Sequence, residues 1–437
     1  MKLESGHGRR NLADIRGPNL LLDVECSTFG GLPAVWMRPM LSVLNPEIVP
    51  IIQEYTIGLW PIFGIGDRPK LIVKAVKEVL LAAKINRGFK IYVCPMTLAG
   101  RTTIGLISAF FDDEDEPLVI RTALLDIDLT RLLIKAMNCD KLDIHFFDEH
   151  NRELLGYLSE LEYPATTKDH LNSSSYCAFD LELAKSADDQ MTAWFGNRTH
   201  DDDDLAIKVK FVETLFPEDL FILDARPDLH LYQGGSQFSF SELERKEPGT
   251  FQEQDIARSL MRLFSPSQIY MNPLRITDRE EIADILVITK SEVIVVQAKD
   301  SPNIERVLKN SLDRKKAVAR KSLRKAISQV SGAIGYLRSM SPVKMIVGGE
   351  TSEIDISNQT VRALIVVKEL FNDEYSVYTP HVLKLWEEAQ IPCIALDYAE
   401  LQMYVTHLSN EESFFQAFDR VFSHGVKTGQ FPRLRIW

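Results

Sequence analysis

Cysteine is scarce in this chain of 437 residues, which has five cysteines scattered along its length. Their number is odd, and no two of them form a Cys-x-x-Cys pair. Because zinc ribbons and disulfide frameworks depend on paired cysteines, the sequence indicates neither. Isolated thiols suit a reducing compartment, so we expect a cytoplasmic protein.

Long apolar runs and common catalytic motifs are also missing. No run approaches the length that spans a bilayer, and the polar start, Met1–Arg10, lacks the apolar centre of a signal peptide, so no membrane partner is expected. The sequence contains no internal repeat, no Gly-x-x-x-x-Gly-Lys-Ser/Thr loop and no Gly-x-Ser-x-Gly turn. The first half therefore carries no motif that assigns it a chemistry.

Positive charge is in short supply, because 62 acidic residues outnumber 50 basic ones and leave a formal net charge of −12. This balance argues against a protein that binds nucleic acid over its whole surface. Between Phe251 and Met345, however, 17 Lys and Arg residues stand against 10 Asp and Glu residues, while the rest of the chain has 33 against 52. Such a basic segment indicates either one dedicated surface for a polyanion or a solvated helix face.

Two domains are predicted from the places where the sequence pattern changes. Residues 1–235 are typical of an acidic α+β region with a mostly antiparallel sheet, since short apolar runs alternate with polar turns from Phe89 onward. The run Lys70–Lys84 is expected to be helical, because its apolar residues cover one broad side. A segment rich in glycine and charge, Gln233–Gly249, separates this region from a second domain at residues 245–437.

Two β-branched runs joined by a short polar turn stand out between Arg279 and Asp300. Polar residues interrupt the apolar runs at few places: Asp284 in the first, Gln297 and Lys299 in the second. With a turn at Thr289–Glu292, antiparallel pairing places Asp284 opposite Gln297, and Lys299 lies two residues further along on the same face. The sequence therefore predicts that a carboxylate, an amide and an ammonium group converge on one spot.

The pattern Asp284…Gln297-x-Lys299 resembles the PD-(D/E)xK nuclease superfamily. It is most similar to the branch with Gln in place of the usual Glu, as in Mrr-like restriction endonucleases. The resemblance covers roughly Gln252–Tyr404, about a third of the chain. It implies a restriction-endonuclease-like α/β core, in which a helix, a three-stranded meander, a second helix and a further strand build a mixed sheet flanked by helices.

The same resemblance implies a site for Mg²⁺ or Mn²⁺. The implied metal ligands are Glu253, Asp284, Gln297 and the backbone carbonyl of Ala298. The implied catalytic residues are Asp284, Gln297 and Lys299. Because glutamine supplies one negative charge fewer than glutamate, we expect a lower metal affinity than in the usual family site. Glu280 and Glu281, just before the first run, fit either further acids of the site or solvated turn residues.

A long helical stretch is expected from Pro302 to about Ser339, where apolar residues follow helical spacing. It fits either one continuous helix or two helices with a break near residues 311–312. Most basic side chains of this stretch fall away from the apolar stripe. We expect the following residues to bind nucleic acid: Arg314, Lys315, Arg320, Lys321, Arg324 and Lys325.

Together with the resemblance, these features predict a metal-dependent deoxyribonuclease whose partner is DNA. By analogy with restriction systems, its role would be bacterial defence against foreign DNA. The acidic first region would contact a protein partner or build a homo-oligomer. Two alternatives stay open: a catalytically inactive fold that binds nucleic acid without cutting it, and a structural subunit of a larger complex.

Overall fold

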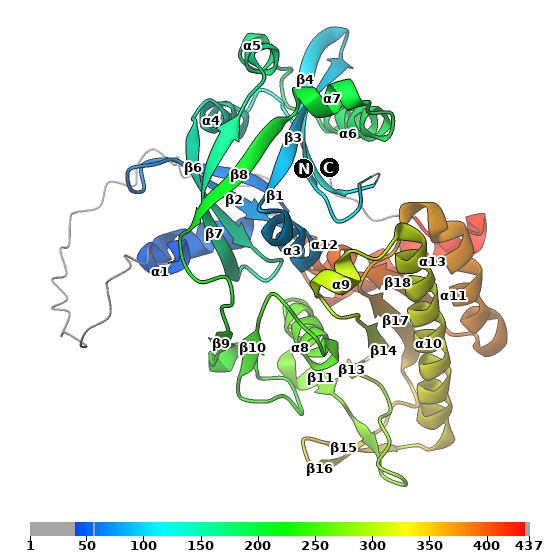
Figure 1. Cartoon of the computed structure of the whole chain (residues 1–437). Coiled ribbons are helices and arrows are strands. Elements are labelled where there is room, and N and C mark those ends of the chain that lie inside the picture. The colour runs from blue at the N-terminus through cyan, green and yellow to red at the C-terminus, as the bar shows by residue number, and fades with distance from the viewer. Residues whose placement is uncertain (1–39, 56, 115, 433–437) are drawn as a thin grey trace, which may run out of the picture. The chain divides into compact units, whose positions relative to one another are not determined.

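The computed structural model describes residues 40–55, 57–114 and 116–432. Within this range the chain forms two large β-sheets, one in each half of the sequence, and each has its own hydrophobic core (Figure 1). The two cores are built by different strands.

The N-terminal sheet has eight strands in the order β1-β2-β6-β7-β8-β3-β4-β5. Among the described strands of this sheet, β2 and β6 pair in parallel and the other neighbours are antiparallel. The end strands β1 and β5 also approach each other, so the sheet curls into a nearly closed barrel. The expectation of a mostly antiparallel sheet with helices is confirmed. The strands are β1 (Gly58–Ile62), β2 (Lys70–Lys74), β3 (Gly88–Leu98), β4 (Arg101–Phe110), β5 (Leu118–Ala123), β6 (Lys141–Phe147), β7 (Glu153–Glu162) and β8 (Ile207–Thr214).

The helices of this half cover the sheet and its connections. They are α1 (Leu41–Leu44), α2 (Val49–Glu54), α3 (Lys77–Asn86), α4 (Asp128–Met137), α5 (Ala165–Ser173), α6 (Leu181–Gly196) and α7 (His200–Leu205). The predicted helix Lys70–Lys84 is wrong in its first part, because residues 70–74 form the inner strand β2 and the helix α3 begins at Lys77. A short apolar run that is buried on both faces fits a strand as well as a helix, and periodicity does not separate the two.

The C-terminal sheet is mixed and has five strands in the order β11-β13-β14-β17-β18. The first three pair antiparallel, whereas β14, β17 and β18 run parallel. Its strands are β11 (Ile269–Met271), β13 (Ile285–Ile288), β14 (Glu292–Lys299), β17 (Thr360–Val367) and β18 (Cys393–Asp397). Its helices are α8 (Gly249–Leu260), α9 (Glu305–Leu308), α10 (Leu312–Ser339), α11 (Tyr375–Ala389), α12 (Tyr398–His407) and α13 (Glu411–Thr428). The expected mixed sheet flanked by helices is confirmed. Of the two alternatives for the long helical stretch, the structure has the break before Leu312.

Smaller strands lie beside this sheet. β12 (Leu274–Arg275), β15 (Val343–Val347) and β16 (Glu350–Ile354) form a three-stranded sheet, and β9 (Ile222–Asp224) pairs with β10 (Ser239–Ser241). The hairpin β9–β10 spans the glycine-rich segment at residues 234–235. Tyr232, just before that segment, packs in the C-terminal core.

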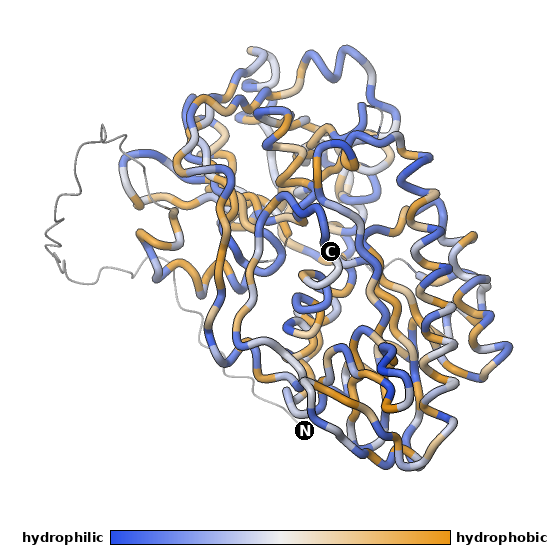
Figure 2. The backbone as a smooth tube through the Cα atoms, turned by 60° about the horizontal axis from the view of Figure 1, so that its bottom comes forward, coloured by the Kyte–Doolittle hydropathy of each residue, from blue (hydrophilic) through white to orange (hydrophobic). Residues whose placement is uncertain are grey.

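The central strands of the C-terminal sheet are mostly apolar because helices cover both of their faces. The side chains of Val295 and Leu364 are fully buried, as is typical of strands inside a parallel layer. Figure 2 shows hydrophobic residues gathered along these strands and hydrophilic residues along one side of the long helix α10. The helix packs its apolar stripe on β14 and β17, which holds the end of the β13–β14 hairpin in place.

Buried charged groups join the two halves of the described chain. The turn between β6 and β7 is a polar sequence, yet Arg152 within it is buried and donates from its two terminal nitrogens to the Asp255 carboxylate on α8, at 3.1 and 2.9 Å. Its Nε donates to Asp148 at 2.7 Å. Arg245 reaches Asp255 at 3.4 Å, and the ammonium of Lys77 lies 3.5 Å from the same carboxylate. Asp255 is therefore the shared partner of three buried cations.

Replacing Glu149 with glutamine is expected to make stability less sensitive to pH. Burial, with a smaller contribution from Asp148, raises the pKa of Glu149 to about 8. A raised carboxyl pKa means that the folded protein holds a proton which the unfolded chain releases, so stability falls as pH rises from about 5 to 8. The Glu149→Gln protein should lack this loss and gain about 1.4 kcal/mol relative to wild type per pH unit over that range.

The measurement is urea unfolding at several pH values for both proteins. The control is Glu213→Gln on β8, where the side chain is exposed. Parallel curves for wild type and Glu149→Gln would show that Glu149 titrates as an ordinary surface acid.

In the part of the chain that the structure describes, no helix is both long and apolar enough to cross a membrane. The cysteines found there, Cys94, Cys139, Cys177 and Cys393, are free thiols. Neither finding bears on the residues outside this part.

Candidate active site

The hairpin of β13 and β14 has the register expected from the sequence. Ile288 pairs with Val293, and the backbone N–H of Thr289 donates to the carbonyl of Glu292 at 2.9 Å to close the turn. The pairing continues to Ile285 and Val296. One step further, the side chains of Asp284 and Gln297 meet, and both are buried, at 4% and 2% exposure. The prediction that these two groups share one spot is confirmed.

The ammonium group of Lys299 lies among oxygen atoms of this spot. It donates to the backbone carbonyl of Ala298 at 2.5 Å and to Asp284 Oδ2 at 3.2 Å. The same carboxylate oxygen accepts from the backbone N–H of Ala298 at 2.5 Å, which fixes its position. A carboxylate and a carbonyl thus already converge on one positive charge, as the oxygen ligands of a cation would.

The side-chain amide of Gln297 can face Asp284 with either end. With its oxygen inward it accepts from Lys299 Nζ at 3.4 Å. With its nitrogen inward it donates to the two Asp284 oxygens at 3.1 and 3.3 Å. The second orientation suits the protein without a bound cation, since an ionised carboxylate can only accept hydrogen bonds. A glutamate at this position would lack that choice.

Two further acids lie near Asp284. Glu253 comes from α8, and burial raises its pKa to about 7, with Asp284 and Glu281 adding to the shift. Glu281 reaches the surface, but the protein around its carboxyl removes part of its hydration. This loss of hydration and the Asp284 charge raise the pKa of Glu281. Asn272, with its amide nitrogen turned inward, donates to Glu281 Oε1 at 3.2 Å. The negative charges of Glu253, Glu281 and Asp284 repel one another. A bound divalent cation would relieve this repulsion.

Glu280 takes a different position from Glu281. Its carboxylate lies 3.6 Å from Arg275 on β12 and is solvent-exposed. Of the two acids that the sequence left open, Glu281 therefore belongs to the site region and Glu280 to the surface.

The oxygen set fits a small divalent cation such as Mg²⁺ or Mn²⁺ in its chemistry. Across residues 40–55, 57–114 and 116–432, no three His, Cys, Asp or Glu side chains are grouped as a ready metal site. Mg²⁺ commonly takes only one or two carboxylates and keeps several waters. For such an ion, Asp284 and Glu253 would supply the carboxylates, and Gln297 and the Ala298 carbonyl would supply neutral oxygens. The ammonium of Lys299 would have to yield its place beside Asp284 to such an ion.

Comparison of the sequence with models of protein families and with curated proteins finds no match.

The six basic residues expected to bind nucleic acid fall into two groups. Lys315 is held by Asp112 of the N-terminal half at 2.6 Å, and Arg320 by Glu374 at 3.1 Å. The other four are exposed and have no ion pair with any described residue: Arg314, Lys321, Arg324 and Lys325. Their spacing along α10 puts them on one stripe of the helix surface. The free surface charge is thus smaller than the sequence suggests, but it is continuous.

Sequence reasoning missed the buried charges beside the site. Asp255 lies next to Ile256 within the apolar stripe of α8, and an acid in such a place needs a partner. That signal could have singled it out, as it did Glu253. Its partners Arg152 and Lys77 could not be found this way, because they lie more than a hundred residues earlier in the chain.

Proposed function

We propose that this protein is a metal-dependent nuclease that hydrolyses phosphodiester bonds of DNA. The observation that carries the proposal is the gathering of Asp284, Gln297 and the Ala298 carbonyl around the Lys299 ammonium, with Glu253 beside them. The helix, antiparallel meander, second helix and parallel strand that hold these groups follow the element order expected for the PD-(D/E)xK fold.

In this proposal the acidic residues bind the metal ion and the lysine contacts the phosphate. Asp284 and Glu253 would hold Mg²⁺ or Mn²⁺, and Gln297 would turn its amide oxygen inward to join them. The bound ion would supply a more acidic water and neutralise charge on the phosphate. The Ala298 N–H keeps the Asp284 carboxylate in place. Lys299, released from that carboxylate, would donate to the phosphate oxygens as negative charge develops on them.

Nucleic-acid binding is assigned to the exposed stripe of Arg314, Lys321, Arg324 and Lys325. Reversing all four to Glu should weaken binding to unrelated DNA duplexes by a similar factor, because bonds to phosphates carry no sequence information. The slope of log affinity against log salt should fall by about one unit for each phosphate that the variant no longer neutralises. Fluorescence anisotropy over a range of salt concentrations measures both quantities.

The matched control reverses two exposed basic residues of α13, Arg420 and Lys427, which lie two helical turns apart. Binding should change little in that variant. An unchanged salt slope after reversal of the α10 stripe would assign DNA binding to another surface.

The proposed activity is tested with end-labelled DNA and RNA duplexes of the same sequence, incubated with the full chain in Mg²⁺, Mn²⁺ or EDTA. Cutting of DNA that needs the metal is expected. Salt-dependent binding to DNA without cutting in either metal would favour the inactive, nucleic-acid-binding alternative.

A further inference from the structure

A polar cavity of 190 Å³ lies at the carboxyl ends of the three parallel strands. β14 is followed by Asp300, β17 by Lys368 and Glu369, and β18 ends at Asp397, and all four residues line the cavity. In sheets of this kind, the carboxyl ends of parallel strands are the usual place for a ligand. The opposite wall comes from the N-terminal half and includes Lys77, Glu78 and Glu149.

Four buried polar atoms lining this cavity have no hydrogen-bond partner among the described residues. They are Lys77 Nζ, Glu149 Oε2, Gln252 Oε1 and Asn303 Oδ1. Each residue is more than nine-tenths buried, with exposures of 6%, 8%, 4% and 5%. An unsatisfied buried polar atom costs about 1–3 kcal/mol, so four around one space indicate that a polar molecule fills it. The volume exceeds that of a single water, about 30 Å³ in the liquid.

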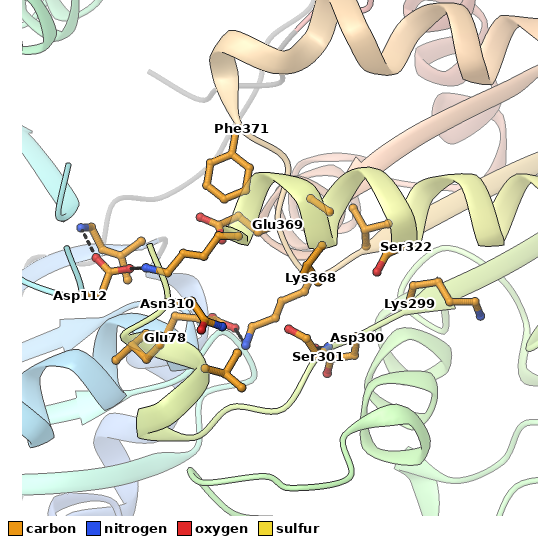
Figure 3. Close-up of a pocket in the computed structure, with 17 residues that line it drawn as sticks. Glu78, Asp112, Lys299, Asp300, Ser301, Asn310, Ser322, Lys368, Glu369 and Phe371 are labelled. Atoms are coloured by element: carbon orange, nitrogen blue, oxygen red, sulfur yellow. Dashed lines mark hydrogen bonds and ion pairs between the residues drawn. The ribbon is translucent and has the colours of Figure 1, made fainter. Parts of the chain in front are cut away.

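The charge of the lining points to a cationic ligand. Asp255 is neutralised by Arg152 and Arg245, and Glu78 by Lys368 at 3.0 Å, the pair drawn with a dashed line in Figure 3. Four further acids line the cavity. Asp397 accepts from the Glu400 N–H and Asp300 from the Ser301 N–H, while Glu149 and Glu369 form no ion pair with a residue in the described ranges. Three of the four atoms without a hydrogen bond are acceptors, and the fourth, Lys77 Nζ, lies 3.5 Å from the Asp255 carboxylate. A ligand that satisfies this cavity would therefore bring positive charge and N–H donors, and not negative charge.

The pKa values of Glu149 and Glu369 agree with this imbalance. Burial raises the pKa of Glu149 to about 8, against the lowering influence of Lys77. Burial, helped by Glu78 and Asp112, raises the pKa of Glu369 to about 7. The raised pKa values favour the neutral form of both carboxyls, which a nearby cation would oppose.

The cavity is distinct from the candidate active site. Figure 3, a close-up of the neighbouring pocket, shows the ammonium of Lys299 pointing away from Glu78 and Lys368, whereas Asp300 turns toward them. Successive residues of a strand point to opposite sides, and Lys299 does not line the cavity although Asp300 does. They are nonetheless only one residue apart along the chain.

We propose that this cavity binds a small organic cation with two or more N–H donors, such as an aliphatic diamine. Its acceptors come from separate elements, the β6–β7 turn, α8 and the loop after β14, and all of them line the space. That layout suits a molecule with spaced donor groups. A single metal ion needs oxygens that converge on one point, whereas these acceptors are spread over three separate elements of the lining. The ligand would contact both halves of the chain at once.

The proposal is tested by isothermal titration calorimetry on the full chain without nucleic acid, so its outcome is independent of the nuclease activity. Putrescine is the probe, and tetramethylammonium, which has charge but no N–H donor, is the comparison. Saturable binding of putrescine alone is expected. Glu149→Gln should weaken it about 10- to 100-fold, the loss of one charge-assisted hydrogen bond, and Gln252→Leu should weaken it as well. Glu213→Gln should leave it unchanged.

Four results would overturn the proposal. No heat from putrescine would show that the cavity holds only water. Equal binding of tetramethylammonium would show a site that recognises charge without donors. Binding of Mg²⁺ that Glu149→Gln removes, without binding of putrescine, would make it a metal site. Unchanged binding of putrescine by a folded Glu149→Gln protein would show that the ligand binds elsewhere. Circular dichroism of the Glu149→Gln and Gln252→Leu proteins checks that they fold.

Discussion

Replacing Asp284 with asparagine is expected to abolish metal-dependent cutting of DNA while leaving the fold intact. Asparagine keeps the size of the side chain and an oxygen that can accept from the Ala298 N–H, a bond of 2.5 Å in the structure. It removes the negative charge that a divalent cation requires from this position. The loss should therefore appear in activity and in Mn²⁺ binding, and should not appear in the circular dichroism spectrum.

Replacing Lys299 with alanine should slow cutting by about 10²- to 10³-fold, the usual cost of one group that stabilises charge in the transition state. Metal binding should be retained or become tighter, because the ammonium no longer occupies the place beside Asp284, 3.2 Å away. Lys290→Ala, in the exposed turn of the same hairpin, is the matched control and should cut normally. If Lys299→Ala cuts as fast as wild type, the lysine has no part in catalysis.

Replacing Asp255 with alanine is expected to cost about 3–5 kcal/mol of stability, the penalty of breaking a buried ion pair on one side. The change leaves Arg152, Lys77 and Arg245 buried without their shared carboxylate. Urea unfolding at neutral pH measures the effect. A change below about 1 kcal/mol would mean that water or the neighbouring acid compensates the cations, and that the halves are held together by other contacts.

Glu253→Ala, two residues earlier on α8, is the control, for which we expect loss of cutting without loss of stability. Its carboxyl has a raised pKa because of burial and the nearby Asp284 charge, so its removal relieves repulsion and should leave stability nearly unchanged. It should impair metal-dependent cutting instead. The pair of variants separates the acid that holds the fold from the acid assigned to the site.

The geometry of the hairpin could be predicted from the sequence because it depends on local pattern. β-branched runs fix the strands, the polar turn at residues 289–292 fixes the register, and alternation then places Asp284 and Gln297 together. The mixed C-terminal sheet and the mostly antiparallel N-terminal sheet follow from the same kind of pattern. The break before Leu312 was one of two alternatives, since apolar spacing alone fits both.

Contacts between distant segments could not be predicted in this way. Lys315 lies in a basic run that is typical of a helix surface, yet its ammonium pairs with Asp112, which is 203 residues earlier. Arg152 looks like a hairpin-turn residue, and its burial becomes evident only once α8 is placed against the turn. Periodicity reports which face of an element is apolar and does not report which element covers it. The polar cavity at the ends of β14, β17 and β18 was missed for the same reason.

The most direct test of the central claim is the conversion of supercoiled plasmid DNA to nicked or linear forms by wild type and Asp284→Asn proteins side by side. Both proteins are incubated in Mg²⁺ or Mn²⁺ and in EDTA, after their folds have been matched by circular dichroism. The account predicts conversion by wild type in at least one metal, none in EDTA, and none by Asp284→Asn in any condition. Conversion by both proteins at the same rate, or by neither in either metal, would contradict the assignment of this site as a metal-dependent nuclease centre.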